Sequence, residues 1–206
     1  MVAHEKYQLS ALIGVVLGWV LSQFTDILKT KRRVRSLRKA LLTEIGDLYR
    51  WIERLILIQR KGMMFCYKGF APESMPFQLP IHVYSQYYAE ISPKLTYSER
   101  ISFGSIYGLI SLMNSQHNRL ESIIHESIKD KSKIIEAIAI FEAGYYNSLT
   151  AMHQIKFHVE HGKNIDISKI EDNDCAYIDK KATESINKLR IDSQNSTIEQ
   201  IRNIKG

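Results

Sequence analysis

Hydrophobic and polar positions divide the chain into an apolar first segment and a longer part with helical periodicity. No charged residue occurs between Tyr7 and Thr25, and the apolar composition continues to Leu28. About 20 residues at a rise of ~1.5 Å match the ~30 Å hydrocarbon thickness of a bilayer. The pattern predicts a transmembrane helix over residues 7–28, preceded by a short tail over residues 1–6.

Two alternatives exist for this first segment. A secretory signal peptide carries its positive charge before the apolar core, whereas the bases of this chain follow the core. A helix buried in a globular core is the second alternative, because short apolar runs are ambiguous. The basic run directly after Leu28 favours the membrane-spanning helix over both.

Helical periodicity with a polar face begins after Thr30. Apolar residues recur every three or four positions as far as about residue 61: Val34, Leu37, Leu41, Ile45, Leu48, Ile52 and Leu55. This spacing predicts an amphipathic helix that ends at Gly62. No proline or glycine separates it from the first segment, so one rod over residues 7–61 is compatible with the pattern.

Two further long helices are predicted before residue 162. Thr96 and Glu99 have the spacing of a capping box, and the apolar periodicity behind them extends to about residue 129. A second periodic segment runs from about Ile134 to His161. The short polar turn between the two makes them an antiparallel hairpin. The predicted fold class is therefore all-α, an N-terminal transmembrane helix continuing into a small antiparallel bundle over residues 40–162. Residues 163–206 are polar and are predicted to be partly helical.

The connection over residues 62–96 is rich in prolines and aromatic residues. All four prolines lie here, and they exclude a long helix. The aromatic side chains form a predicted surface for a partner or ligand: Phe65, Tyr67, Phe70, Phe77, Tyr84, Tyr87 and Tyr88. The alternative is that these rings seal one end of the helical core.

Charge is unevenly distributed along the 206 residues, a length that suits one domain. The chain carries 28 Lys and Arg against 22 Asp and Glu, a net charge of +6. Residues 1–39 hold eight of these bases and two of the acids, so residues 40–206 are neutral. The neutral body predicts no nucleic-acid partner. The two cysteines exclude a disulfide scaffold and a four-cysteine zinc site.

The basic segment over residues 29–39 predicts the topology. Its bases are Lys29, Lys31, Arg32, Arg33, Arg35, Arg38 and Lys39. The positive-inside rule places such a cluster in the cytoplasm, and anionic lipid headgroups attract it. We therefore expect a bacterial inner-membrane protein with its N-terminus outside and residues 40–206 in the cytosol.

Small residues recur every four positions within the first segment. Ser10, Gly14, Gly18 and Ser22 extend a G-x-x-x-G motif by one small residue at each end. Such a face lets another helix approach closely. It predicts association with a second copy or with a membrane partner protein, and lipid exposure of the face is the alternative.

Several motifs typical of enzymes are absent from the sequence. It contains no P-loop, dinucleotide-binding, G-x-S-x-G or H-E-x-x-H motif. His117, Glu121 and His125 share one helix face, a geometry that can hold a metal. The histidines of the second predicted helix lie toward the other end of the hairpin. We expect solvated or hydrogen-bonded histidines, no metal and no cofactor.

Arg119 and His125 lie six positions apart on one predicted helix. This pair resembles the Arg-to-His motif of HEPN ribonucleases, which are also all-helical. The resemblance covers two residues and implies that they act on an RNA phosphodiester at a dimer interface.

Together these patterns predict a membrane-anchored helical interaction protein, an anchor, sensor or scaffold rather than an enzyme. One alternative is an oligomerising effector that perturbs the membrane, for example in phage defence. The second is a HEPN-like ribonuclease with Arg119 and His125 as catalytic residues.

Overall fold

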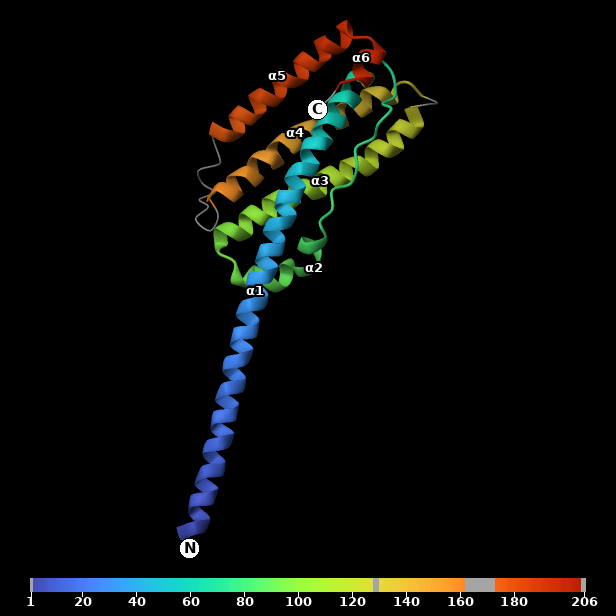
Figure 1. Ribbon diagram of the computed structural model, residues 1–206. Coiled ribbons are helices and arrows are strands. Elements are labelled where there is room, and N and C mark those ends of the chain that lie inside the picture. The colour runs from blue at the N-terminus through green and yellow to red at the C-terminus, as the bar shows by residue number, and fades with distance from the viewer. Residues whose placement is uncertain (1, 128–129, 162–172, 205–206) are drawn as a thin grey trace.

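All regular secondary structure in the described part of the chain is helical (Figure 1). The computed structural model describes residues 2–127, 130–161 and 173–204, with the backbone alone for residues 2–13, 15 and 173–175. Its elements are α1 (Val2–Tyr67), α2 (His82–Ile91), the 3₁₀ helix η1 (Ser92–Lys94), α3 (Tyr97–Ser127), α4 (Lys133–His161), α5 (Asn173–Asn195) and α6 (Ile198–Arg202). The predicted all-α helical bundle is confirmed.

The 66-residue helix α1 belongs to two different environments. Its N-terminal part, residues 2–32, projects from the rest of the molecule and is called the arm below (Figure 1). Its C-terminal part packs against α4 and α5, and α3 pairs with α4. The arm is therefore one end of a helix whose other end is built into the bundle, which is called the body.

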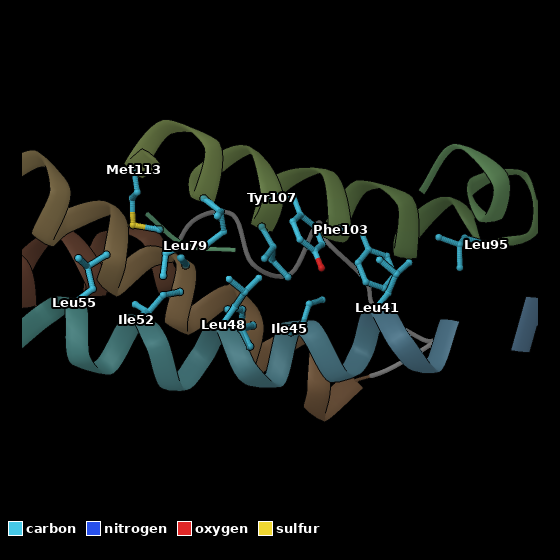
Figure 2. Close-up of a cluster of buried hydrophobic side chains, with 14 of the residues drawn as sticks. Leu41, Ile45, Leu48, Ile52, Leu55, Leu79, Leu95, Phe103, Tyr107 and Met113 are labelled. Carbon is cyan, nitrogen blue, oxygen red and sulfur yellow. The ribbon is translucent and has the colours of Figure 1, made fainter. Parts of the chain in front are cut away.

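The predicted apolar positions of α1 form the core of the body next to the arm. Leu41, Ile45, Leu48 and Ile52 are at most 1% exposed. They face side chains of α3 and of the connecting segment, which include Phe103, Tyr107, Met113, Leu79 and Leu95 (Figure 2). Spacing of three and four residues keeps such side chains on one helix face. That face is what holds α1 in the body.

A second buried cluster closes the far end of the bundle. It joins the last turns of α1 to α3, α4, α5 and α6 through Met63, Phe65, Leu120, Phe141, Leu189 and Ile201. The Ser193 hydroxyl donates to the Met64 carbonyl oxygen at 3.0 Å. The C-terminal helices are thus part of the same core.

Helix α1 ends five residues later than the sequence pattern suggests. Gly62 is inside the helix, where a Cβ would lie 2.4 Å from the ring of Phe141. The helix ends at Tyr67, and Gly69, two residues later, has φ of +78°. The Phe70 N–H donates to the Phe65 carbonyl oxygen at 3.0 Å, as in a Schellman motif. Gly62 allows α4 to approach closely, and Gly69 is the terminating glycine.

Glu44 on α1 fixes the start of α2. Its carboxylate accepts hydrogen bonds from the backbone N–H of Val83 at 2.7 Å and of Tyr84 at 3.0 Å. The Tyr107 hydroxyl donates to the same carboxylate at 2.6 Å. An acid at a helix N-terminus satisfies free N–H groups and complements the helix dipole. One side chain therefore links α1, α2 and α3.

The prediction of a transmembrane helix over residues 7–28 is wrong for the part of the chain with described side chains. No helix there combines the length and hydrophobicity that a bilayer requires. Among the described side chains, the polar residues Ser22, Gln23, Thr25 and Asp26 interrupt the apolar segment before Leu28 and lower its hydrophobicity. Most side chains before Val16 lie outside the described residues.

The predicted localisation depended on that span and is wrong with it. The assignment to a bacterial inner membrane, N-terminus outside and C-terminal domain cytoplasmic, took residues 29–39 as the bases flanking a transmembrane helix. With no membrane-spanning helix among the described residues, the positive-inside rule no longer applies to those bases.

Candidate interaction surface on the projecting helix

The arm exposes large apolar side chains on most of its circumference. Eight of them between residues 16 and 28 are at least 41% exposed: Val16, Leu17, Trp19, Val20, Leu21, Phe24, Ile27 and Leu28. Contiguous exposed apolar surface is uncommon on monomeric proteins and marks interaction sites. The arm is therefore the candidate functional surface of the chain.

Four of these side chains form a continuous row. Leu17, Leu21, Phe24 and Leu28 are spaced four, three and four residues apart and are between 41% and 65% exposed. This is the spacing of the contact positions in a pair of packed helices. Gly14 lies one step before Leu17 in the same row. We call these five residues the seam.

The predicted small-residue stripe lies partly on this surface. A Cβ added at Gly14 or at Gly18 would meet no other atom within 4 Å. Ser22 is exposed, and the side chain of Ser10 lies outside the described residues. Gly14 is in the seam and Gly18 flanks it, so both leave space for large side chains of another helix.

The predicted basic segment divides into paired and exposed bases. Arg33 forms a two-pronged ion pair with Glu90 on α2, with an Nη2–Oε2 distance of 2.8 Å. This contact holds the pKa of the Glu90 carboxyl below its usual value. The Arg38 guanidinium donates to Glu99 on α3. These two bases attach α1 to the body at the base of the arm.

The remaining bases of the segment point to solvent. Lys29 lies 3.9 Å from Asp26, one turn earlier on the same helix. The others are exposed along α1: Lys31, Arg32, Arg35 and Lys39. A collar of positive charge therefore surrounds α1 where it leaves the body.

A buried polar cluster lies beneath this collar. Glu99 is 3% exposed, accepts from the Thr96 backbone N–H at 2.9 Å, and completes the predicted capping box of α3. Nearby, Ser102 Oγ lies 2.7 Å from His158 Nδ1 on α4, and both residues are buried. Burial lowers the pKa of His158, although the Glu99 carboxylate opposes this shift.

The serine and the histidine form no accessible catalytic site. Ser102 is 6% exposed and His158 is 2% exposed, so neither offers a surface that a substrate could reach. Their role in the fold is to satisfy each other's hydrogen-bonding groups inside the bundle. The sequence pattern gave no reason to pair them, because the two residues are 56 positions apart.

Most of the predicted aromatic surface is packed against the body. Phe65 is buried, and partly buried rings include Tyr67, Phe77, Tyr84, Tyr87 and Tyr88. Tyr84 stacks on Tyr107 with ring centroids 3.8 Å apart and on Tyr88 at 4.4 Å. Of the seven, Phe70 is the exposed one, at 54%. The rings thus line the contact between the connecting segment and the bundle.

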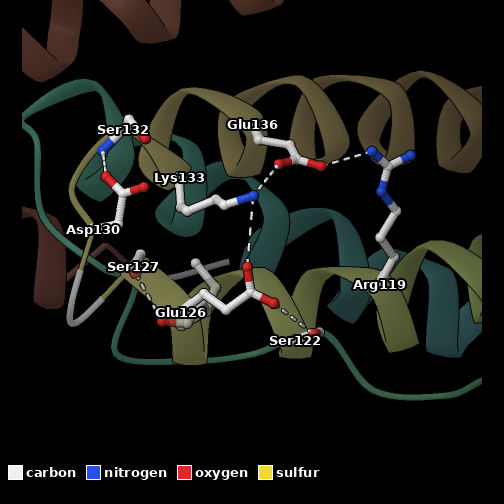
Figure 3. Close-up of polar contacts among 9 residues, drawn as sticks. Arg119, Ser122, Glu126, Ser127, Asp130, Ser132, Lys133 and Glu136 are labelled. Atoms are coloured by element: carbon white, nitrogen blue, oxygen red, sulfur yellow. Dashed lines mark hydrogen bonds and ion pairs between the residues drawn. The ribbon is translucent and has the colours of Figure 1, made fainter.

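Arg119 and His125 lie in different environments near the turn between α3 and α4. Arg119 donates to Glu136 on α4 at 2.6 Å, and Lys133 lies 3.3 Å from the same carboxylate and 3.5 Å from Glu126 (Figure 3). Arg119, followed by Lys133, lowers the pKa of Glu136. Six residues place His125 about 120° around α3 from Arg119. The pair of the HEPN resemblance therefore lies on two faces, and its catalytic role stays a prediction.

The predicted histidine face of α3 does not assemble into a metal site in the described structure. Among the residues searched, no three His, Cys, Asp or Glu side chains are grouped for a metal ion. Glu121 and His125 are exposed and His117 is partly buried. Among the residues searched, α4 therefore contributes no ligand that would complete a metal site with these three side chains.

Comparison with known proteins adds no family to this description. No protein-family model, curated protein or solved structure matches the chain. What the geometry defines is an all-α body carrying a projecting helix with an exposed apolar seam.

Proposed function

We propose that this protein is a helical interaction module whose arm pairs with the arm of a second copy. The observation that carries the proposal is the seam, a row of large apolar side chains that no part of the described chain covers. Burying one such side chain contributes about 1.5–3 kcal/mol when it was fully exposed. The seam residues are about half exposed, so their pairing is expected to be reversible.

The seam favours an antiparallel pair of arms. With Leu21 opposite Leu21 of the second copy, Leu28 of each arm lies over Gly14 of the other, and Phe24 lies beside Gly18. Large side chains then fill the space left by glycines, which supports close packing. A parallel pair places glycine against glycine and Phe24 against Phe24, which leaves gaps at one end and crowding at the other.

The basic collar supports the same orientation. In a parallel pair, Lys31, Arg32 and Arg35 of the two copies lie next to one another. In the antiparallel pair, the two Arg32 positions are separated by 22 residues, or about 33 Å along the helix axis. This is several times the ~8 Å Debye length at physiological salt, so the repulsion is screened.

Sedimentation equilibrium of the full chain tests the proposal. We expect a concentration-dependent monomer–dimer equilibrium, and we expect Leu21→Glu to abolish the dimer because two carboxylates meet at the centre of the pair. The matched control is Ile191→Glu, an apolar residue of similar exposure on α5. This control is expected to dimerise like the parent protein.

Three results would contradict the proposal. One is a parent protein that stays monomeric at 100 μM, which would mean that pairing contributes less than about 5.5 kcal/mol. Another is a dimer that persists in Leu21→Glu. A third is equal loss of the dimer in Ile191→Glu, which would assign the contact to the body.

A further inference from the structure

A cleft lies where the arm leaves the body. Its volume is about 730 Å³, and it is bounded by α1 on one side and by η1 and the residue after it on the other. Its apolar lining includes Ile27, Val34 and Leu95. Small-molecule sites have volumes of roughly 300–1,000 Å³ and a mainly apolar lining with a few polar groups. The cleft has the size of such a site, and polar or charged residues supply the other seven of its ten lining positions.

Positive charge is concentrated at the rim of this cleft. Four bases and one acid line it: Lys31, Arg35, Arg38, Lys94 and Asp26. Arg38 is engaged by the buried carboxylate of Glu99, and Asp26 lies beside Lys29. Among the described residues, Lys31, Arg35 and Lys94 form no ion pair. The cleft therefore presents three uncompensated cations next to an apolar floor.

An apolar track leads from the cleft onto the arm. Val34, Ile27 and Val20 are spaced by seven residues, close to two helical turns, so they lie on one face. Val20 and Ile27 are exposed, at 47% and 51%. From Val34 to Val20 the helix rises about 21 Å, close to the length of an extended acyl chain of about sixteen carbons.

We propose that the cleft binds one long-chain carboxylate, a free fatty acid, with its headgroup at Arg35 and Lys94 and its chain along Val34, Ile27 and Val20. A planar guanidinium binds a carboxylate through two hydrogen bonds, and a lysine adds a point charge. The acyl chain covers apolar surface that is otherwise in water. The carboxylate thus lies against positively charged side chains, and the acyl chain lies against apolar side chains.

This inference does not depend on pairing of the arms. The track of Val20, Ile27 and Val34 and the seam residues Leu17, Leu21, Phe24 and Leu28 lie on different faces of α1, about 90° apart from centre to centre. A monomeric variant of the seam is therefore expected to keep the ligand site. Failure of one proposal leaves the other intact.

Fluorescence of Trp19 tests the binding directly. The chain has two tryptophans, and Trp51→Phe leaves Trp19, which lies next to Val20 on the arm, as the single reporter. Titration of this full-length protein with palmitate below its micelle concentration is expected to shift the emission to shorter wavelength and to saturate at one palmitate per chain. Shortening the acyl chain is expected to lower the affinity roughly three- to fourfold per CH₂.

Charge reversal tests the headgroup site. Arg35→Glu with Lys94→Glu is expected to weaken palmitate binding at least tenfold. The matched control reverses one exposed arginine and one exposed lysine elsewhere, Arg50→Glu with Lys180→Glu, and is expected to bind within twofold of the parent. Leu21→Glu is also expected to bind within twofold.

Other outcomes would overturn the proposal. Equal affinity for palmitate, hexadecanol and hexadecyltrimethylammonium would show that no anionic headgroup is recognised. Binding to phospholipid vesicles without binding to monomeric palmitate would assign the surface to a bilayer. Loss of binding in Leu21→Glu would place the acyl chain between two arms instead of in the cleft.

Discussion

The two ends of α1 carry similar apolar residues in opposite environments. In the body, Leu41, Ile45 and Ile52 are fully buried against α3 and α4, whereas Leu21 and Phe24 on the arm are more than 60% exposed. The helix itself is continuous from Val2 to Tyr67. The difference is therefore set by what packs against the helix and not by its local composition. An apolar periodicity therefore predicts a contact face of a helix, but it does not indicate whether the partner of that face lies in the same chain.

Removing one large ring from the body and one from the arm is expected to give the largest difference between the two regions. Phe103→Ala leaves a cavity among fully buried side chains, so we expect the free energy of unfolding to fall by about 3–5 kcal/mol. Phe24→Ala is expected to change the unfolding of the dilute monomer by less than about 0.5 kcal/mol. Urea unfolding followed by circular dichroism measures both values. Similar losses for the two variants would show that the arm packs against its own body.

Glu44 tests how strongly the connecting segment is attached to the body. Glu44→Ala leaves the N–H groups of Val83 and Tyr84 and the Tyr107 hydroxyl without their acceptor. We expect a loss of about 2–4 kcal/mol in the free energy of unfolding. Glu53→Ala, at an exposed position of the same helix, is the control and is expected to stay within about 0.5 kcal/mol. Equal stability of the two variants would exclude this capping role.

Two glycines of α1 are expected to respond in opposite directions to alanine. Gly62→Ala places a Cβ against the ring of Phe141, which we expect to cost about 1–3 kcal/mol. At Gly46 nothing lies within 4 Å of the added Cβ, so alanine is expected to stabilise the helix by about 0.5–1 kcal/mol. Thermal unfolding of the two variants shows the signs. A stabilising Gly62→Ala would contradict the close approach of α1 and α4.

Those glycines also show what the sequence could predict. Helical periodicity located α1, α3 and α4, because spacing of apolar residues is a local property. The sequence pattern predicts a helix end at Gly62, because a sequence does not show that α4 packs there and brings Phe141 against it. The termination at Gly69 has a local signal, a glycine just after the last turn, but Gly62 carries the same signal seven residues earlier.

The candidate surface was predicted less well than the fold. The length of the first apolar segment suggested a bilayer, and the described residues do not support a span. The pairings of Glu44 with α2, of Arg38 with Glu99 and of Ser102 with His158 join residues 39 to 61 positions apart. No local pattern reports such contacts. The row of Leu17, Leu21, Phe24 and Leu28 was present in the sequence, but an apolar segment read as lipid-facing gives no reason to single out one of its rows.

Exchanging a small and a large residue across the seam tests whether the two arms pair in antiparallel orientation. In the antiparallel pair, Gly14→Leu puts a leucine against Leu28 of the other copy, and we expect the dimer to weaken at least tenfold. Combining it with Leu28→Ala restores a large residue opposite a small one and is expected to recover the dimer. In a parallel pair Gly14→Leu would strengthen the contact. Sedimentation equilibrium of both variants distinguishes the two orientations. Recovery of the dimer with an unchanged free energy of unfolding of the body would assign the effect to the arm.

The smallest expected effect concerns pH and the buried histidine. Burial lowers the pKa of His158 in the folded protein, so below about pH 6.5, where an unfolded histidine takes up a proton, folding becomes less favourable as the pH falls. Above that pH the contribution is constant. His158→Asn removes the titrating group, and its stability is expected to change less than that of the parent between pH 7.5 and 5.5. Parallel pH profiles of the two proteins would contradict this assignment.

Distance between the arms of two copies is the most direct test of the account. Spin labels at Arg32→Cys, in a chain with Cys66→Ala and Cys175→Ser, report this distance by pulsed dipolar spectroscopy. The antiparallel pair predicts a separation of about 33 Å along the axis, lost on adding Leu21→Glu. A separation of about 10–15 Å, the width of two adjacent helices, or the absence of any dipolar coupling at concentrations where the protein is a dimer, would contradict the account.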